Sequence, residues 1–334
     1  MADLQLYLLI LRIPGLRTAE KSGLAGKFDS YGDLSALSKN DIEAIIGRRL
    51  EEPWEMDEIR RMAADDHAAA KRAGIKMVCL GDPGYPPLLR EIYDPPVVIF
   101  YRGVLPDPEQ PLAAMVGTRQ PSSGAASFAY KMGRDLGDYG IPVVSGLALG
   151  IDALSHRGNT DAHAPAAAVL GSGVDQVYPS SNRALAKRIL DNGGILLSEY
   201  PPEMGPRKWH FPARNRIISA LARGTVIVEA PEKSGALITA GFALEQGRDL
   251  WVTSIGVNSF RGKGTAKLAA DGAGVIDNAL DILAEWGLSA DKNPGLGFAD
   301  RIDPDDISGN PETGRSLASA LARSLKIEEI LEYK

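Results

Sequence analysis

Short apolar runs that end near glycine alternate with helical segments between residues 111 and 286. Apolar runs stand at 112–117, 142–146, 164–171, 193–197, 225–229 and 250–253, and helical patterns fall between several of them, at 122–139, 151–158, 182–191 and 236–246. Strands that alternate with helices of this length pair in parallel and are covered by helices on both faces. The pattern predicts an α/β fold with a doubly wound, Rossmann-like and mostly parallel sheet.

Other segments flank this predicted domain at 111–286. Residues 1–75 are predicted to form a small helical domain, either a bundle of the helix-hairpin-helix or sterile-alpha-motif type or a plain structural cap. Residues 76–110 are rich in proline and predict a rigid connection that contains one strand. Residues 287–315 have the composition of a linker, and 316–334 predict a short C-terminal helical segment.

Composition narrows the classes of protein that need consideration. The single Cys79 excludes a disulfide framework and a cysteine-rich zinc site, and the four histidines show no metal-ligand spacing, so no metal or other cofactor is expected. The chain has no apolar run of about 18 residues and its beginning lacks a secretory pattern. We therefore expect a cytoplasmic protein without a membrane partner.

Small residues gather in the loops that follow the predicted strands. In a parallel sheet these loops meet at the carboxyl ends of the strands, where ligands bind. Glycine ends strands in many α/β proteins, but here it recurs in several loops at one predicted rim. Because glycine lets backbone amides approach an anion closely, the rim predicts an anion-binding surface, made by residues 117–119, 145–150, 171–173 and 234–236.

Positive charge is local although the formal net charge is −6. Residues 183–223 contain eight basic residues against three acidic ones. Some of them suit an ordinary solvated helix face, but four flank or lie in the segment 210–216 (HFPARNR), namely Arg207, Lys208, Arg214 and Arg216. A protein that binds a polyanion needs positive charge at the binding surface only. The segment is predicted to be a phosphate-binding loop at the rim.

The same residues carry a family resemblance. The chain from about 81 to 286 resembles the DprA (Smf) family of DNA-processing proteins in a series of ordered motifs: 116–119 (VGTR), 145–153 (SGLALGIDA), 169–173 (VLGSG), 210–219 (HFPARNRIIS) and 234–239 (SGALIT). The resemblance implies a single-stranded DNA-binding mediator without catalytic activity. It further implies a homodimer that loads RecA recombinase onto incoming DNA in natural transformation.

The resemblance also implies roles for individual residues. Arg119 and Lys208 match basic positions that bind the single strand, and Phe211 matches a position that stacks a base. Where relatives carry a basic residue after Tyr178-Pro179, this chain has serines, so Arg183 is expected to take over that contact. Phosphates are expected on the backbone amides of Gly171, Ser172, Gly173 and Gly235.

Three alternatives stay open at this point. Phe211 could instead be a core aromatic that anchors the loop. Arg214 and Arg216 could contact phosphate or form ion pairs that shape the loop. The segment 234–239 ahead of Glu245 is also similar to the glycine-threonine-glutamate loop of nucleotide phosphoribohydrolases, which would make the chain an enzyme on nucleoside monophosphates. A dinucleotide-binding dehydrogenase is excluded because the glycine fingerprint is missing.

Overall fold

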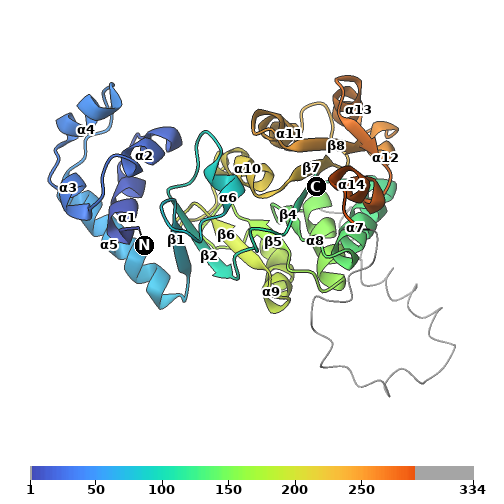
Figure 1. The fold of residues 1–334 in the computed structure, drawn as a ribbon, viewed down its shortest axis with the longest axis horizontal. Helices are drawn as coiled ribbons and strands as arrows, with labels where there is room; N and C mark the ends of the chain where they lie inside the picture. The colour runs from blue at the N-terminus through green and yellow to red at the C-terminus, as the bar shows by residue number, and fades with distance from the viewer. Residues whose placement is uncertain (1, 290–334) are drawn as a thin grey trace, which may run out of the picture. The chain divides into compact units, whose positions relative to one another are not determined.

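The computed structural model describes residues 2–289, and within them the strands form one nine-stranded sheet (Figure 1). The predicted linker beyond residue 289 and the predicted helix at 316–334 lie outside the described residues. Across the sheet the strands run in the order β1 (Lys76–Cys79), β2 (Val98–Gly103), β6 (Ile195–Ser198), β5 (Ala167–Val169), β4 (Val143–Ser145), β3 (Ala113–Val116), β7 (Gly224–Ile227), β8 (Asp249–Thr253) and β9 (Gly274–Ile276).

The sheet is mostly parallel, as predicted. Only β2 pairs antiparallel with its neighbours β1 and β6, whereas all other neighbouring strands are parallel. In β3, β4, β5, β6 and β7 every residue is buried. Strands covered on both faces need apolar side chains at each position, which explains the unbroken apolar runs in the sequence.

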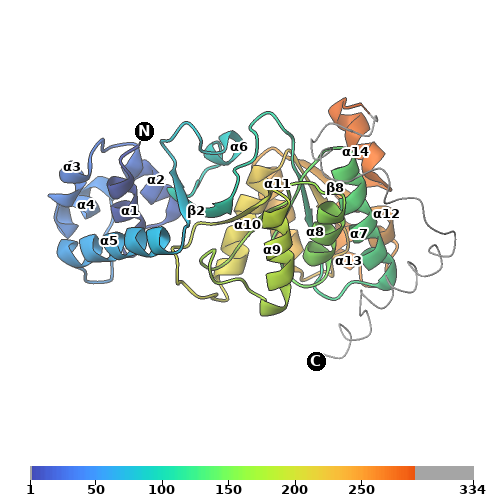
Figure 2. The ribbon, with the colours of Figure 1, turned by 90° about the horizontal axis from the view of Figure 1, so that it is seen from below.

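Helices cover both faces of the sheet, which confirms the doubly wound fold. One face is packed by α7 (Ser123–Asp138), α8 (Ile151–Asp161), α9 (Arg183–Asp191) and α14 (Ala279–Trp286). The opposite face is packed by α6 (Pro87–Arg90), α10 (His210–Leu221), α11 (Gly235–Glu245) and α13 (Lys263–Ala270). Figure 2 shows α7, α8 and α9 together on one side. The short α12 (Ser254–Val257) and the 3-10 turn η1 (Ser180–Asn182) complete this region.

The N-terminal residues form a helical bundle. Its helices are α1 (Leu4–Arg12), α2 (Thr18–Ala25), α3 (Tyr31–Ser35), α4 (Lys39–Ile46) and α5 (Met56–Arg72). In α1 the consecutive residues Leu6 to Ile10 are all buried, because other elements surround this helix. The bundle's apolar cluster includes Val98 and Phe100 of β2, so the bundle and the sheet share one core. The segment 76–110 was predicted to contain one strand, but it contains two, β1 and β2, and both extend the sheet.

The largest difference from the prediction is at residues 210–216, which were predicted to form a loop and instead form the first part of helix α10. Pro212 is its third residue, in the first turn, where backbone N–H groups have no acceptor within the helix. Proline therefore does not break this helix. Helix α10 is hard to predict because it buries basic as well as apolar side chains. It therefore lacks the single apolar stripe that is typical of a surface helix.

Candidate single-strand-binding site

A cavity of about 740 Å³ opens at the carboxyl ends of β3 and β7. It is lined by the loops that follow β3, β4, β5 and β7 and by one side of α10, and we call it the rim cavity. The strands that follow β3 in the sequence, β4 to β6, lie on one side of β3, and β7 to β9 lie on its other side. The cavity therefore lies where the order of strands reverses. This is the position at which doubly wound sheets bind ligands.

An arginine and two aromatic rings meet in the rim cavity. The guanidinium carbon of Arg119 lies 5.8 Å from the ring centre of Phe211. The ring of Tyr178 lies 5.6 Å from that of Phe211 at an interplanar angle of 42°. Arg119 is exposed, and the side chain of Tyr178 is 50% exposed. The place of Tyr178 beside Phe211 was not predicted, although its position in the loop after the glycines that follow β5 is a signal that could have found it.

Positive potential enters the rim cavity from two further groups. Lys208 lines the cavity and is exposed. Gly235 is the first residue of α11, whose N-terminus also lines the cavity and is capped by Ser234, the hydroxyl of which accepts the amide of Ala236 at 3.2 Å. A helix N-terminus carries a partial positive charge and exposes amide donors. The rim cavity therefore suits an anion beside an aromatic surface.

Arg214 forms the floor of the rim cavity. It is buried, and its Nη1 donates to the carbonyl of Gly146 at 2.7 Å and to the carbonyl of Val169. Burial lowers the pKa of Arg214 to about 10, against the opposing effect of the nearby Asp152 carboxylate, so the group stays charged at neutral pH. Gly146 has no room for a side chain, because a Cβ there would lie 2.1 Å from the guanidinium. Arg214 thus ties the ends of β4 and β5 together.

Arg216 lies on the opposite side of α10. Its guanidinium donates to both carboxylate oxygens of Glu199 at 2.7 Å, and its Nε lies 3.0 Å from Oδ2 of Asp94. These carboxylates raise the pKa of Arg216 despite its burial. Of the two roles left open for Arg214 and Arg216, phosphate contact or shaping of the segment, the structure favours the second: both guanidinium groups are buried and bonded within the protein.

The comparisons with known proteins agree with this geometry. The sequence model of the family described as DNA recombination-mediator protein A matches residues 76–287, the whole stretch from β1 to the end of α14. The chain belongs to this family, and the DprA (Smf) resemblance is confirmed.

Individual relatives extend beyond the matched family region. The DNA processing protein DprA of Streptococcus pneumoniae is 40% identical over 278 residues, which cover 80% of this chain and 95% of that protein. DprA of Bacillus subtilis is 40% identical over 220 residues, 65% of this chain and 73% of its own. The crystal structure of the Streptococcus protein has a TM-score of 0.71 at 33% identity and covers 85% of this chain and 99% of its own.

A second solved relative is a single-stranded DNA-binding protein. DNA processing protein A of Helicobacter pylori, which binds single-stranded DNA, has a TM-score of 0.55 at 27% identity and covers 64% of this chain and 95% of its own.

The glycine loop after β5 differs from the role that the family resemblance implied. The amide of Gly173 donates to the carbonyl of Met204 at 2.8 Å, and the hydroxyl of Ser172 donates to the carbonyl of Gln176 at 2.6 Å. Gly171 is buried against Phe211, where a Cβ would lie 3.0 Å from the ring. The burial of all three residues and the bonded amide of Gly173 speak against the expectation that the amides of Gly171, Ser172 and Gly173 hold phosphate. Gly171 packs against Phe211.

Two predicted residues lie away from the rim cavity. Arg183 is exposed and begins α9, but it is not among the residues that line the cavity. Glu245 is exposed and ends α11, ten residues from Gly235, which corresponds to about 15 Å along a helix. A phosphoribohydrolase would need this glutamate in the cavity. Glu245 therefore does not lie where the phosphoribohydrolase alternative needs a catalytic carboxylate.

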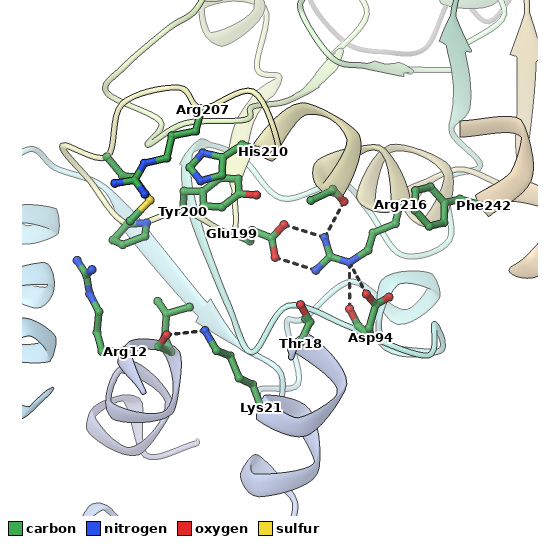
Figure 3. A pocket seen from close by; sticks show the side chains of 14 residues that line it. Arg12, Thr18, Lys21, Asp94, Glu199, Tyr200, Arg207, His210, Arg216 and Phe242 are labelled. Atoms are coloured by element: carbon green, nitrogen blue, oxygen red, sulfur yellow. Dashed lines mark hydrogen bonds and ion pairs between the residues drawn. The ribbon is translucent and has the colours of Figure 1, made fainter. Parts of the chain in front are cut away.

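A second cavity, of about 410 Å³, lies on the other side of α10 between the N-terminal helices and the sheet (Figure 3). We call it the junction cavity. Its wall contains the rings of Tyr200 and His210, stacked with centres 3.8 Å apart. From α2, Lys21 donates to the carbonyl of Leu11 at 2.7 Å, and burial lowers the pKa of Lys21 to about 8.

Two classes of feature are missing from residues 2–289. No three His, Cys, Asp or Glu side chains in this range gather in a way that could hold a metal ion. None of the helices described in this range is long and apolar enough to span a membrane.

Proposed function

We propose that this protein is a single-stranded DNA-binding recombination mediator of natural transformation. In this proposal it protects incoming DNA and loads RecA recombinase as a homodimer, and it has no catalytic activity of its own. The observation that carries the proposal is the meeting of Arg119, Lys208 and Phe211 at one cavity at the strand ends. The single-stranded DNA bound by the Helicobacter pylori relative supports the choice of ligand.

The rim cavity would grip a strand without reading its sequence. Phe211 and Tyr178 offer ring faces to a base, and stacking on an aromatic contributes about 1–3 kcal/mol per base for any base. Arg119, Lys208 and the N-terminus of α11 at Gly235 would hold the adjacent phosphates. All of these groups recognise features that every nucleotide has. A mediator that must coat arbitrary DNA needs such binding.

The geometry favours single strands over duplexes. A base can stack on Phe211 only after it leaves its partner, because the aromatic ring is half-buried in a cavity and is not presented on a flat surface. Unpairing and unstacking cost a few kcal/mol in a duplex. We therefore expect oligo(dT) to bind more tightly than a duplex of equal length.

Fluorescence anisotropy with single- and double-stranded oligonucleotides at two salt concentrations tests the proposal. Arg119→Ala and Lys208→Ala should each weaken single-strand binding and make the slope of log K against log salt shallower by about 0.7. Lys187→Ala is the matched control, since Lys187 is exposed on α9 and paired with Asp191 at 2.6 Å, away from the cavity. Unchanged affinity and slope in both rim variants would overturn the site.

The proposed partners need separate measurements. Equilibrium sedimentation tests the homodimer, and RecA filament formation on strands coated with a single-strand-binding protein tests the loading activity. A nucleoside monophosphate hydrolysis assay runs beside them. Hydrolysis without DNA binding would contradict the proposal and favour the enzyme alternative.

A further inference from the structure

In the segment 207–211, at the start of α10, different residues line the two cavities. Arg207 and His210 line the junction cavity, whereas Lys208 and Phe211 line the rim cavity. Trp209 stands between them, lines neither cavity, and is 65% exposed. Its neighbours in the chain are Lys208 of the rim cavity and His210 of the junction cavity, and its indole is exposed to solvent.

The exposure of Trp209 is unusual for a tryptophan in this chain. The other three, Trp54, Trp251 and Trp286, are at most 7% exposed. The guanidinium carbon of Arg207 lies 5.6 Å from the ring centre of Trp209, and His210 meets the indole edge-on with centres 6.0 Å apart. An exposed indole beside a guanidinium is suited to stacking a nucleobase while a phosphate is neutralised beside it.

The junction cavity continues the same chemistry. Arg207 stands at one side of it, and Lys21 and Arg12 of the N-terminal helices face it from the other (Figure 3). Arg12 is held by Asp66, and the carboxylates of Glu199 and Asp94 are held by Arg216. The ion pairs of the described residues include neither Arg207 nor Lys21. Arg207 is exposed, and the ammonium of Lys21 has two donors besides the one that meets the carbonyl of Leu11.

We propose that Trp209 is a second stacking platform, over which a single strand passes from the rim cavity into the junction cavity. The strand leaves the rim past Lys208, stacks a base on Trp209, and places its next phosphates near Arg207 and Lys21. The N-terminal helices thereby contribute to DNA binding. This inference rests on the proposed function of the rim cavity and extends its binding path.

The fluorescence of Trp209 reports on this path directly. Because the other tryptophans are buried, a base stacked on the indole of Trp209 should quench the solvent-exposed part of the emission. Titration with oligo(dT) of about 16 nucleotides is expected to quench the wild type. Trp209→Phe should lose the quenching yet keep its affinity within about twofold, because phenylalanine also offers a ring face.

Affinity measurements separate stacking from folding. Trp209→Ala should weaken binding of the 16-nucleotide strand by about tenfold and leave binding of a strand of about 4 nucleotides, which occupies the rim cavity alone, unchanged. Lys21→Gln keeps a donor for the carbonyl of Leu11 and should make the salt slope for the longer strand shallower by about 0.7. Leu280→Ala, an exposed apolar position on α14, is the control and should change neither affinity.

The outcomes distinguish this inference from the function on which it rests. If Lys208→Ala weakens binding while Trp209→Ala does not and the wild-type emission stays constant, the second platform is wrong and the rim site stands. If the wild type binds neither length of strand, both proposals are overturned.

Discussion

Arg214 and Arg216 point to opposite sides of α10, and that separation decides what each of them does. Residues two apart on a helix do not face each other. Arg214 therefore reaches the strand ends below the rim cavity, and Arg216 reaches Glu199 and Asp94 in the junction cavity. One helix thus braces the floor of one cavity and the wall of the other, while the exposed residues before it remain available to a ligand.

Loss of Arg216 is expected to destabilise the fold. Arg216→Met leaves the half-buried carboxylate of Glu199 without its partner, and loss of one partner of a buried ion pair costs at most about 3–5 kcal/mol. Urea unfolding followed by circular dichroism measures this change in the free energy of unfolding. Arg119→Ala is the control at an exposed arginine and should stay within about 0.5 kcal/mol. A loss below about 1 kcal/mol in Arg216→Met would contradict the bracing role.

Because of the buried His156, we expect the stability of the fold to fall at acid pH. This histidine is fully buried on α8, and burial lowers its pKa to about 3. Between pH 6.5 and 3 the unfolded chain binds a proton that the folded chain does not, so stability is lost as the pH falls through this window. His156→Met should flatten the decline from pH 6.5 to 4.5 by about 2 kcal/mol. Urea titrations at both pH values measure it, and an equal decline in the two proteins would refute the assignment.

At the scale of elements, glycine sets the distance between α7 and α8. A Cβ on Gly158 would lie 2.0 Å from the carbonyl oxygen of Tyr130, and one on Gly133 would lie 2.3 Å from that of Ser155. The two helices can touch backbone to backbone only because both positions lack a side chain. This contact fixes the helix layer beneath β4. It thereby also positions the loop after β4, in which the carbonyl of Gly146 accepts from Arg214.

A single methyl group tests this contact. Gly158→Ala forces α7 and α8 apart and should cost about 1–3 kcal/mol or more of stability. The matched control is Gly241→Ala on α11, where a Cβ meets no atom within 4 Å. Because alanine favours helix more than glycine does, this control should stabilise the protein by about 0.5–1 kcal/mol. Thermal melts of both variants give the comparison, and a neutral Gly158→Ala would disprove the tight approach.

The elements that the sequence predicts well are those with one simple pattern. The central strands are buried on both faces and read as apolar runs, and most helices between them bury one stripe. β9 has only Ile276 buried and gives too short a signal. Helix α10 was missed because its cations are buried by partners far away in the sequence, such as Asp94. Arg119, Lys208 and Phe211 were predicted to share a site from motif and loop position, and the rim cavity joins them.

For the molecule as a whole, the net charge is negative, whereas positive side chains line the two cavities. The formal net charge of −6 opposes binding of a polyanion at long range, so the DNA affinity that we propose must come from the cations that line the two cavities. Screening by salt weakens the repulsion between the protein and DNA as well as the local attraction. Because a single-site variant leaves the net charge nearly unchanged, the difference in salt slope between the variant and the wild type reports the contact that was removed.

The shared core of the bundle and the sheet leads to a last prediction. Val97, Val98 and Phe100 are buried in the same apolar cluster as α1, and full burial of such a side chain contributes about 1.5–3 kcal/mol. A fragment that begins at Lys76 exposes these side chains on the sheet. Its free energy of unfolding should be about 5 kcal/mol lower than that of the full chain, so it should unfold at a lower urea concentration. The exposed side chains should also bind an apolar dye.

Leu8→Ala in the full chain supplies the matched comparison, because Leu8 is fully buried at the centre of this cluster. The substitution should cost about 2–5 kcal/mol. It should also lower the unfolding midpoints of the bundle and of the sheet together, since both depend on the same core. Emission from Trp54 follows the bundle and emission from Trp251 follows the sheet, each in a variant whose other tryptophans are replaced by phenylalanine. If the Lys76 fragment unfolds at the midpoint of the full chain, or if Leu8→Ala shifts only the Trp54 transition, the two parts are independent, and the N-terminal helices do not stabilise the sheet that carries the binding site.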